Sequence, residues 1–347
     1  MMRSFFRAGL SALFVAAAIP AAQAAAPVPP LYNLAAMVPL GGAAHWDYMH
    51  YHTATGQLFI AHGHTLSVVD TATNKLQGNV MGLDDTHGIA FNPATGLGYT
   101  DSSGTQTLSV FNPATLKVEK TLPSLDDTDG MVFDPATGKI FVAAGDSAAL
   151  LALNPATDAE MKIPLGGAPE YLAANGHGQV FVALNDKNEI AAVDAKTGQV
   201  TARWPLPGCE APTGVAIDPG ASRVFTSCQN GKLAVVNTDT GAEVALLPIG
   251  KGSDSAAFDT KRHLIFSANS TGTLSVIREV NANRYVALVP VKTRLGARTM
   301  AVNEATGDVY LVTATPMGKG VVKHPGFAPR YKFEPGTLTL LVYHPAS

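Results

Sequence analysis

The sequence predicts an all-β fold, a seven-bladed β-propeller of four-stranded antiparallel blades, and three observations predict it. A turn-forming residue recurs at one phase of a repeat that is 41 to 43 residues long. Each repeat holds four short apolar runs bounded by Pro, Gly, Asn or Asp. The chain of 347 residues contains 33 Gly and 23 Pro but only 15% charged residues, which suits many short strands and tight turns better than helices.

A proline marks the phase of the repeat in six units, and a glycine marks it in the second. From each marker, a polar loop leads to a first apolar run. A turn such as residues 92–96 or 134–138 then leads to a second run, such as 139–144, and a polar loop leads to a third, such as 66–70. A further turn and a fourth run complete the unit. The seven markers are Pro39, Gly82, Pro123, Pro164, Pro205, Pro248 and Pro290.

Four antiparallel strands within a period of about 40–45 residues are typical of a propeller blade. One blade cannot bury both of its faces, so neighbouring blades must stack around an axis. The seventh unit supplies three strands, from residues 298–303, 308–314 and 337–344. A spare run at residues 32–38 precedes the first unit. We expect it to be the outer strand of the last blade, where it closes the ring and removes an open edge.

The first residues have the pattern of a signal peptide. Two arginines precede an apolar run at residues 8–19 and a small-x-small cleavage site, Ala-Gln-Ala. The apolar run is too short to span a bilayer. We expect a signal peptide over residues 1–24, cleavage after Ala24, and a single propeller domain over residues 25–347. The mature protein is expected in the periplasm without a membrane span.

Export would place the chain in an oxidising compartment. Cys209 falls in the loop that leads into blade five, and Cys228 falls at the end of that blade's second strand. The two strands pair antiparallel, so we expect a disulfide between these residues. It would close a loop of about twenty residues and contribute about 3 kcal/mol. A pair of free thiols is the alternative.

Two segments resemble the YVTN-type β-propeller family. Residues 65–75 (TLSVVDTATNK) resemble the core of its repeat, which reads roughly T-V-S-V-I-D-x-x-T-N-K, and residues 211–219 (APTGVAIDP) are similar to its P-x-G-V-A-x-x-P segment. The resemblance covers the mature chain and implies a propeller. That family includes secreted binding proteins, surface-layer components and enzyme subunits, so it implies no single function. The chain has no Tyr-Val-Thr-Asn; the equivalent segments are 59–62 and 181–184.

In a propeller, the loop into the innermost strand and the loop between the second and third strands open on one face. The residue before each first apolar run therefore predicts a ring at the mouth of the central channel. Six of the seven residues are ionisable, which fits a polar ligand pocket, although a solvated rim would also be charged. The ring residues are Asp47, His87, Asp129, Glu170, Thr213, Asp254 and Arg298.

Six of the ten histidines fall in blade one and at the start of blade two. His50 and His52 alternate with apolar residues, and we expect them to pack between blades. The other four are expected near one mouth, where imidazoles beside carboxylates suit Zn²⁺ or Cu²⁺. Their spacing matches no known ligand motif. The four candidate ligands are His45, His62, His64 and His87.

A pair of acids precedes the ring residue in two neighbouring blades. Residues 84–87 read Asp-Asp-Thr-His, and residues 126–129 read Asp-Asp-Thr-Asp. We expect the Asp and Thr side chains to hydrogen-bond their own backbone and stabilise tight loops. The alternative is a site for a hard cation such as Ca²⁺, with oxygen ligands from adjacent blades.

An insertion at residues 315–335 breaks the period of blade seven, and because it leaves from the end of the second strand, we expect it to overhang the channel mouth. The net charge of −3 gives no global basic field, so nucleic-acid binding would need a local patch such as this one. Basic side chains interleaved with aromatic ones can grip anionic or aromatic ligands, including single-stranded nucleic acid. A solvated loop is the alternative. The residues concerned are Lys319, Lys323, His324, Phe327, Arg330, Tyr331, Lys332 and Phe333.

Three functions are compatible with these features. We favour a monomeric, non-enzymatic binding or scaffold protein that presents the channel mouth to a small molecule or a protein. The second is an enzyme of the lactonase or lyase kind. Related propellers use Glu, His and Arg at the mouth, often with a divalent cation, which would make Glu170 the base, His87 the acid and Arg298 the anion clamp. The third is the handling of copper or zinc by the blade-one histidines.

Overall fold

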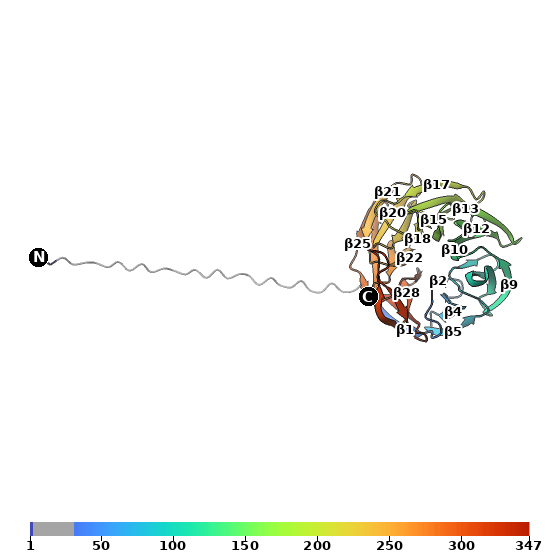
Figure 1. Ribbon diagram of the computed structural model, residues 1–347, viewed down its shortest axis with the longest axis horizontal. Helices are drawn as coiled ribbons and strands as arrows, with labels where there is room; N and C mark the ends of the chain where they lie inside the picture. The colour runs from blue at the N-terminus through green and yellow to red at the C-terminus, as the bar shows by residue number, and fades with distance from the viewer. Residues whose placement is uncertain (3–30, 347) are drawn as a thin grey trace.

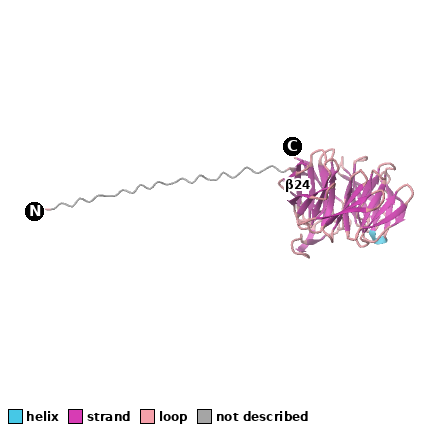
Figure 2. Ribbon diagram, turned by 90° about the horizontal axis from the view of Figure 1, so that it is seen from above, coloured by secondary structure: helices cyan, strands magenta, loops and turns pink. Residues whose placement is uncertain are grey.

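The fold is described by a computed structural model that covers residues 1–2 and 31–346. The predicted cleavage site after Ala24, and the signal peptide apart from its first two residues, lie outside the described residues. Seven antiparallel sheets surround a central axis (Figure 1), and from the edge the body is a disc of strands (Figure 2). In the described part of the chain, no helix has the length and apolar character needed to cross a membrane.

Blades one to six each use consecutive strands, with the first strand innermost. The first strands of neighbouring blades contact each other around the whole ring. Blade one is β2 (Met49–His52), β3 (Gln57–His62), β4 (Thr65–Asp70) and β5 (Lys75–Val80). Blade two is β6 (Ile89–Asn92), β7 (Leu97–Ser102), β8 (Thr107–Asn112) and β9 (Lys117–Pro123), with a short 3₁₀ helix η1 (Ser103–Thr105) after β7. Blade three is β10 (Thr128–Asp134), β11 (Lys139–Ala144), β12 (Ala149–Asn154) and β13 (Ala159–Pro164).

The next three blades repeat this order. Blade four is β14 (Pro169–Ala174), β15 (Gln179–Leu184), β16 (Glu189–Asp194) and β17 (Val200–Pro205). Blade five is β18 (Pro212–Asp218), β19 (Arg223–Cys228), β20 (Lys232–Asn237) and β21 (Glu243–Pro248). Blade six is β22 (Ser253–Asp259), β23 (Leu264–Asn269) and β24 (Thr273–Asn281), with β25 (Arg284–Ala287) and β26 (Val291–Lys292) both paired to β24.

Blade seven is assembled from both ends of the described chain, which confirms the predicted closure. Its strands are β27 (Met300–Asn303), β28 (Asp308–Thr313), β31 (Thr339–Pro345) and β1 (Tyr32–Pro39), in the order β1-β31-β28-β27. The outer strand β1 pairs antiparallel with β31 along its length. The insertion between β28 and β31 forms a separate hairpin of β29 (Pro316–Val321) and β30 (Arg330–Phe333).

The recurring turn sequences form side-chain-stabilised turns. Asn92 Oδ1 accepts the backbone N–H of Ala94 at 2.9 Å, and the N–H of Gly96 returns to the Asn92 carbonyl oxygen at 2.8 Å. Gly96 has φ of +71°, a conformation that favours glycine. Asp134 and Gly138 repeat the arrangement one blade later. These turns join the first and second strands at the face opposite the channel mouth.

Each blade places an aromatic ring at the third position of its second strand. The seven rings are all buried and pack between neighbouring sheets. An aromatic side chain buries a large apolar area at small conformational cost, so one ring per blade supplies much of the contact between blades. The seven residues are Phe59, Tyr99, Phe141, Phe181, Phe225, Phe266 and Tyr310.

Near the axis, the inner strands approach too closely for side chains. A Cβ atom on Gly88 would lie 2.3 Å from the carbonyl oxygen of Asp129. A Cβ atom on Gly130 would lie 2.7 Å from the carbonyl oxygen of Glu170. Each of these glycines directly follows a ring residue, so the backbone of one blade rests on the ring residue of the next.

Candidate functional site

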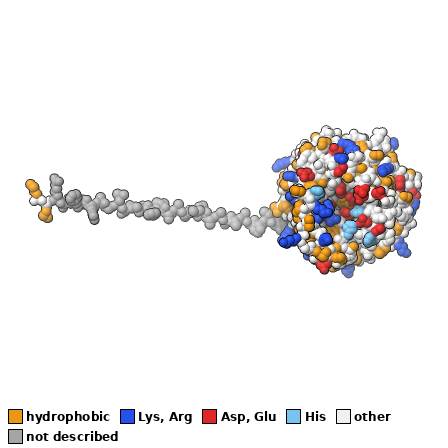
Figure 3. All heavy atoms as spheres, in the orientation of Figure 1, with side chains coloured by type: hydrophobic (Ala, Val, Ile, Leu, Met, Phe, Trp, Pro, Cys, Tyr) orange, Lys and Arg blue, Asp and Glu red, His pale blue; other side chains and the backbone are white. Residues whose placement is uncertain are grey.

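The seven ring residues occupy equivalent positions at the start of the innermost strands. Asp47, His87 and Arg298 stand two residues before β2, β6 and β27, and the other four are second in β10, β14, β18 and β22. Six of the seven line a cavity of about 430 Å³ at the channel mouth, and His87 is not among its lining residues. Acidic and histidine side chains gather near the centre of the face in Figure 3, with basic side chains beside them.

Arg298, the only arginine in the ring, is already paired within the protein. Its Nε forms an ion pair with Asp254, its Nη2 donates to the Trp46 carbonyl oxygen at 3.1 Å, and its Cζ lies 5.2 Å from the Trp46 ring centroid. Asp254 also accepts a hydrogen bond from Gln229 Nε2 at 2.8 Å. The positive charge of Arg298 is therefore already neutralised by Asp254 within the protein.

Among the described residues, Asp47, Asp129 and Glu170 form no ion pair of this kind. Burial raises the pKa of Asp47 to about 6, although Arg298 opposes the shift. Burial, with the charges of Asp254 and Asp47, raises the pKa of Glu170 to about 7. Burial and the same kind of repulsion raise the pKa of Asp129 well above its usual range, and its carboxyl shares a hydrogen bond with Glu170. Among the described residues, Asp129 Oδ1 is buried without a hydrogen-bond partner.

Two tyrosines from opposite sides of the ring meet near the axis, each directly after one of these acids. Tyr48 follows Asp47 in blade one, and Tyr171 follows Glu170 in blade four, on the other side of the axis. Their ring centroids are 4.4 Å apart. Asp47, Asp129 and Glu170 line the cavity together with Tyr48, and we call these three acids its floor.

The blade-seven hairpin forms the roof of the cavity. Phe333 packs edge-on against Trp46, with ring centroids 4.8 Å apart. At the other end, Ala328 lies over Gly252 of blade six, where a Cβ atom would be 2.7 Å from the Ala328 Cβ. The hairpin and its loop contribute these residues to the cavity wall: Lys323, His324, Phe327, Ala328, Pro329, Arg330, Tyr331 and Phe333.

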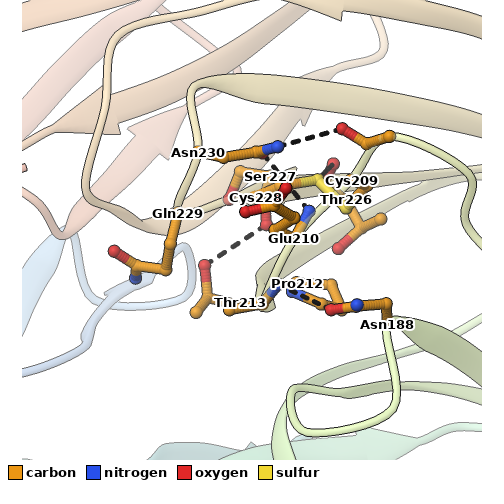
Figure 4. The surroundings of a disulfide bond; sticks show 12 residues. Asn188, Cys209, Glu210, Pro212, Thr213, Thr226, Ser227, Cys228, Gln229 and Asn230 are labelled. Atoms are coloured by element: carbon orange, nitrogen blue, oxygen red, sulfur yellow. Dashed lines mark hydrogen bonds between the residues drawn. A yellow bond between two sulfur atoms is a disulfide. The ribbon is translucent and has the colours of Figure 1, made fainter. Parts of the chain in front are cut away.

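The predicted disulfide between Cys209 and Cys228 is confirmed (Figure 4). The two Cα atoms are 5.5 Å apart, and both residues are buried. Next to the bridge, the backbone N–H of Gln229 donates to the carbonyl oxygen of Glu210 at 3.0 Å, and Asn188 Oδ1 accepts the N–H of Ala211 at 2.8 Å. The bridge thus joins the two loops that contribute Ala211 and Gln229 to the cavity.

The four candidate histidine ligands do not converge as a set. His62 is buried, and both of its ring nitrogens are used: Nδ1 bonds Ser67 Oγ and Nε2 bonds the Ala43 carbonyl oxygen, each at 2.8 Å. His64 is exposed and pairs with Asp84 at 2.6 Å. These contacts separate His62 and His64 from the other two histidines.

His45 and His87 do meet, on either side of Asp85. The distance from Asp85 Oδ1 is 3.4 Å to His45 Nδ1 and 3.9 Å to His87 Nε2. Burial lowers the pKa of His45. Burial also opposes protonation of His87, but its hydrogen bond to Asp101 and the nearby negative charges outweigh burial and raise its pKa to about 9.

The loops with paired acids differ from expectation in one respect. The threonines do not bond to their own loops: Thr86 Oγ1 donates to the carbonyl oxygen of Gly63 at 3.1 Å, and Thr128 Oγ1 donates to Asp101 Oδ2 at 3.2 Å. Both acceptors belong to the preceding blade. The prediction of purely local hydrogen bonding was wrong because each loop packs against the facing loop of its neighbour.

His50 and His52 lie between blades, as the sequence predicted. Their rings pack against Phe91 of blade two, with centroid distances of 5.0 and 4.1 Å. Burial lowers the pKa of His50 to about 4. Both histidines therefore belong to the packing between blades one and two.

Sequence reasoning missed Asp101, which is fully buried and holds His87. A signal for it was present in the repeat. The fifth position of the second strand is small in most blades, and blade two has an aspartate there. The small residues at this position are Ala61, Ala143, Ala183, Ser227 and Ala268.

These blades and their closing strand define a seven-bladed β-propeller with a cavity at one mouth. No protein-family model matches the chain, and no curated protein is detectably similar to it in sequence. Its structure is similar to the hydrazine synthase of Kuenenia stuttgartiensis, with a TM-score of 0.67 and 16% identity over 78% of this chain and 92% of that chain. It is also similar to the WD40 repeats of RRP9, with a TM-score of 0.72 and 9% identity over 89% of this chain and 99% of that one. At these identities, the likeness shows the fold alone.

Proposed function

We propose that the protein is a binding protein whose channel-mouth cavity takes a small molecule carrying a protonated nitrogen. The observation that carries this proposal is that the floor carboxyl groups have no ion-pair partner among the described residues. Asp129 Oδ1 is buried without a partner among the described residues, and the pKa values of Asp129 and Glu170 are raised by burial and by the charges of neighbouring acids. A bound cation would relieve this repulsion and give Asp129 Oδ1 a donor.

The shape and walls of the cavity favour an organic cation over a bare metal ion. Its volume of about 430 Å³ is in the range of small-molecule sites. The roof adds the rings of Phe327 and Tyr331, which suit the carbon skeleton of a ligand. Among the described residues, the floor acids do not form a group of three carboxylates whose oxygen atoms are close enough together to share one ion.

The basic residues of the roof also suggest which group the ligand carries at the end remote from its protonated nitrogen. Lys323 and Arg330 of the hairpin also line the cavity. A molecule with an ammonium group at one end and a carboxylate at the other would match both surfaces. A lactonase- or lyase-type reaction has less support, because His87 is tied to Asp101 outside the lining and Arg298 to Asp254.

We also infer that the protein works in the periplasm and is a divergent relative of the YVTN-type propellers. The disulfide between two buried cysteines supports an oxidising compartment, in agreement with the signal-peptide pattern. The family assignment rests on the sequence of residues 65–75 and 211–219. Periplasmic fractionation of cells expressing the full chain, with amino-terminal sequencing of the product, tests the location and the cleavage after Ala24.

The proposed ligand class can be tested by calorimetry with three probes of equal chain length: putrescine, 4-aminobutyrate and succinate. The titrations are run above the pKa of Glu170, where its carboxylate is ionised. We expect putrescine and 4-aminobutyrate to bind and succinate not to bind. Glu170→Gln should weaken amine binding by roughly tenfold to a hundredfold, since it removes a charge-assisted hydrogen bond.

Asp239→Asn is the matched control, because Asp239 is exposed and lies in the turn between β20 and β21, on the face opposite the channel mouth. It should leave amine binding unchanged. Failure of both amines to bind at about 1 mM would overturn the proposal. Equal binding of succinate and putrescine, or equal amine binding by Glu170→Gln and the wild type, would overturn it as well.

A further inference from the structure

Outside the cavity lining, three side chains from two blades aim their ligand atoms at one point. His45 comes from the loop before β2, and Asp85 and His87 come from the loop before β6. One ligand atom from each lies within 4.8 Å of the others. The distances from Asp85 Oδ1 are 3.4 Å to His45 Nδ1 and 3.9 Å to His87 Nε2. Ligands placed tetrahedrally at about 2.0–2.1 Å from an ion are roughly 3.3 Å apart, so only small side-chain movements separate this group from a metal site.

A fourth residue fixes the orientation of His87. The fully buried Asp101 accepts the N–H of His87 Nδ1 through Oδ2, at 3.0 Å. Its Oδ1 accepts the backbone N–H groups of His87 and Gly88, both at 2.8 Å. With Nδ1 as donor, Nε2 faces Asp85, and a metal ion that binds there displaces the proton from Nε2. Histidine ligands of metals commonly donate their other ring N–H to a carboxylate in this way.

We propose that His45, Asp85 and His87 bind one divalent transition-metal ion of the zinc or copper type, with Asp101 as a positioning residue. Two imidazoles and one carboxylate are the ligands these ions prefer, whereas Ca²⁺ and Mg²⁺ favour oxygen alone. The His45 side chain is 55% exposed, so an ion can reach the site from solvent. Three protein ligands leave a coordination position open for water or another molecule.

This site is separate from the proposed amine cavity, because none of its three ligands lines that cavity. It also differs from two other histidine–carboxylate pairs of the surface. His344 contacts Asp308 at 2.6 Å and His64 contacts Asp84 at 2.6 Å, but neither pair has a second imidazole within reach among the described residues. Those pairs therefore serve as internal controls.

The test is calorimetric titration of the full mature chain, freed of metal and carrying no histidine tag, with Zn²⁺ alone. We expect one Zn²⁺ per chain and much weaker binding of Ca²⁺. His45→Ala and Asp85→Asn should each weaken Zn²⁺ binding by about tenfold or more. Both changes preserve the fold, since His45 is exposed and asparagine tolerates the positive φ of 53° at Asp85. His64→Ala and His344→Ala should bind Zn²⁺ like the wild type.

A second measurement identifies the ligands directly. In the Cu²⁺-loaded wild type, the electron paramagnetic resonance spectrum should show coupling to two imidazole nitrogens, and in His45→Ala to one. The proposal is overturned if there is no one-to-one Zn²⁺ binding, or if His45→Ala and Asp85→Asn bind like the wild type. It is also overturned if the His64 and His344 controls lose as much affinity, which would mean diffuse binding to surface histidines. Putrescine binding is measured in the same variants, so that a failure here is distinguished from a failure of the amine cavity.

Discussion

The guanidinium of Arg298 lies over the indole ring of Trp46, with Cζ 5.2 Å from the ring centroid, and donates a hydrogen bond to the Trp46 carbonyl oxygen at 3.1 Å. Arg298 leads into the inner strand of blade seven, and Trp46 leads into that of blade one. The contact therefore joins the last blade to the first. On its other side, the same indole packs against Phe333 of the hairpin. The buried Trp46 thus contacts both Arg298 of blade seven and Phe333 of the hairpin that covers the cavity.

Trp46→Ala should lower the free energy of unfolding by about 3–5 kcal/mol, because it removes a fully buried ring and leaves a cavity. It should also loosen the hairpin, so that limited trypsin digestion cuts faster at Lys319 and Lys323. Urea unfolding and timed proteolysis measure the two effects. Trp204→Ala is the control, since Trp204 is only partly buried on an outer strand, and its cost should be clearly smaller. Equal costs for the two variants would contradict this role for Trp46.

Removing the disulfide should destabilise the protein without changing the fold. Replacing both Cys209 and Cys228 by serine reopens a loop with a sequence separation of 19 residues. The expected loss is about 3 kcal/mol in the free energy of unfolding, measured by urea denaturation. Wild-type protein that has been unfolded, reduced and alkylated before refolding provides an independent comparison. If both forms unfold at the same urea concentration as the oxidised wild type, the bridge contributes nothing to stability.

The blade architecture could be predicted because a propeller repeats one small unit. Residues at the same phase of the repeat therefore occupy equivalent places in all blades. The marker residues placed Asp47, Asp129 and Glu170 at equivalent points of three blades, and the structure has them second in an inner strand or two residues before one. The outer strand β1 followed from the same counting, since blade seven otherwise lacked its fourth strand. The repeat predicts the path of the backbone. The ring of channel-mouth residues and the closure of blade seven both depend on that path.

Side-chain partners could not be predicted in this way. His62 and His64 are separated by a single glycine, yet one is buried between Ser67 and Ala43 and the other is exposed beside Asp84. Their difference depends on the rotamer of each ring and on the turn at Gly63, neither of which has a period. The side on which the insertion lies followed from where it leaves blade seven. Its contacts with Trp46 and Gly252 could not be predicted, because an insertion has no counterpart in other blades from which its course could be inferred.

Gly130→Ala should destabilise the protein through a clash between blades. The added Cβ would lie 2.7 Å from the Glu170 carbonyl oxygen and 2.9 Å from the Tyr171 Cα, and backbone cannot yield as a side chain can. We expect a loss of about 1–3 kcal/mol in urea unfolding. Gly220→Ala is the control, because Gly220 is exposed and its nearest neighbour is a side-chain oxygen of Asp218 at 3.3 Å. It should change stability by less than about 0.5 kcal/mol, and a similar loss in both variants would argue against close packing at the axis.

The acidic floor should make stability fall as the pH rises towards neutrality. Burial, with the charges of Asp254 and Asp47, raises the pKa of Glu170 from 4.5 to about 7. Between these two values the folded protein keeps a proton that the unfolded chain has lost. The free energy of unfolding therefore decreases with pH across this window. Urea unfolding of the wild type and of Glu170→Gln at a series of pH values should show the wild type losing stability relative to the variant from about pH 4.5 to 7.

Asp194→Asn supplies a control, because the pKa of Asp194 is lowered in the folded protein, whereas that of Glu170 is raised. Hydrogen bonds from the backbone and side chain of Thr197 lower the pKa of Asp194, so its contribution is present above the unfolded value of 3.8 and is lost as the pH falls below it. The difference between wild type and Asp194→Asn should therefore stay level from pH 4.5 to 7, where the Glu170→Gln difference changes. If the Glu170→Gln difference is also level there, the folded protein does not hold a proton at Glu170. The repulsion that supports an amine ligand would then be absent.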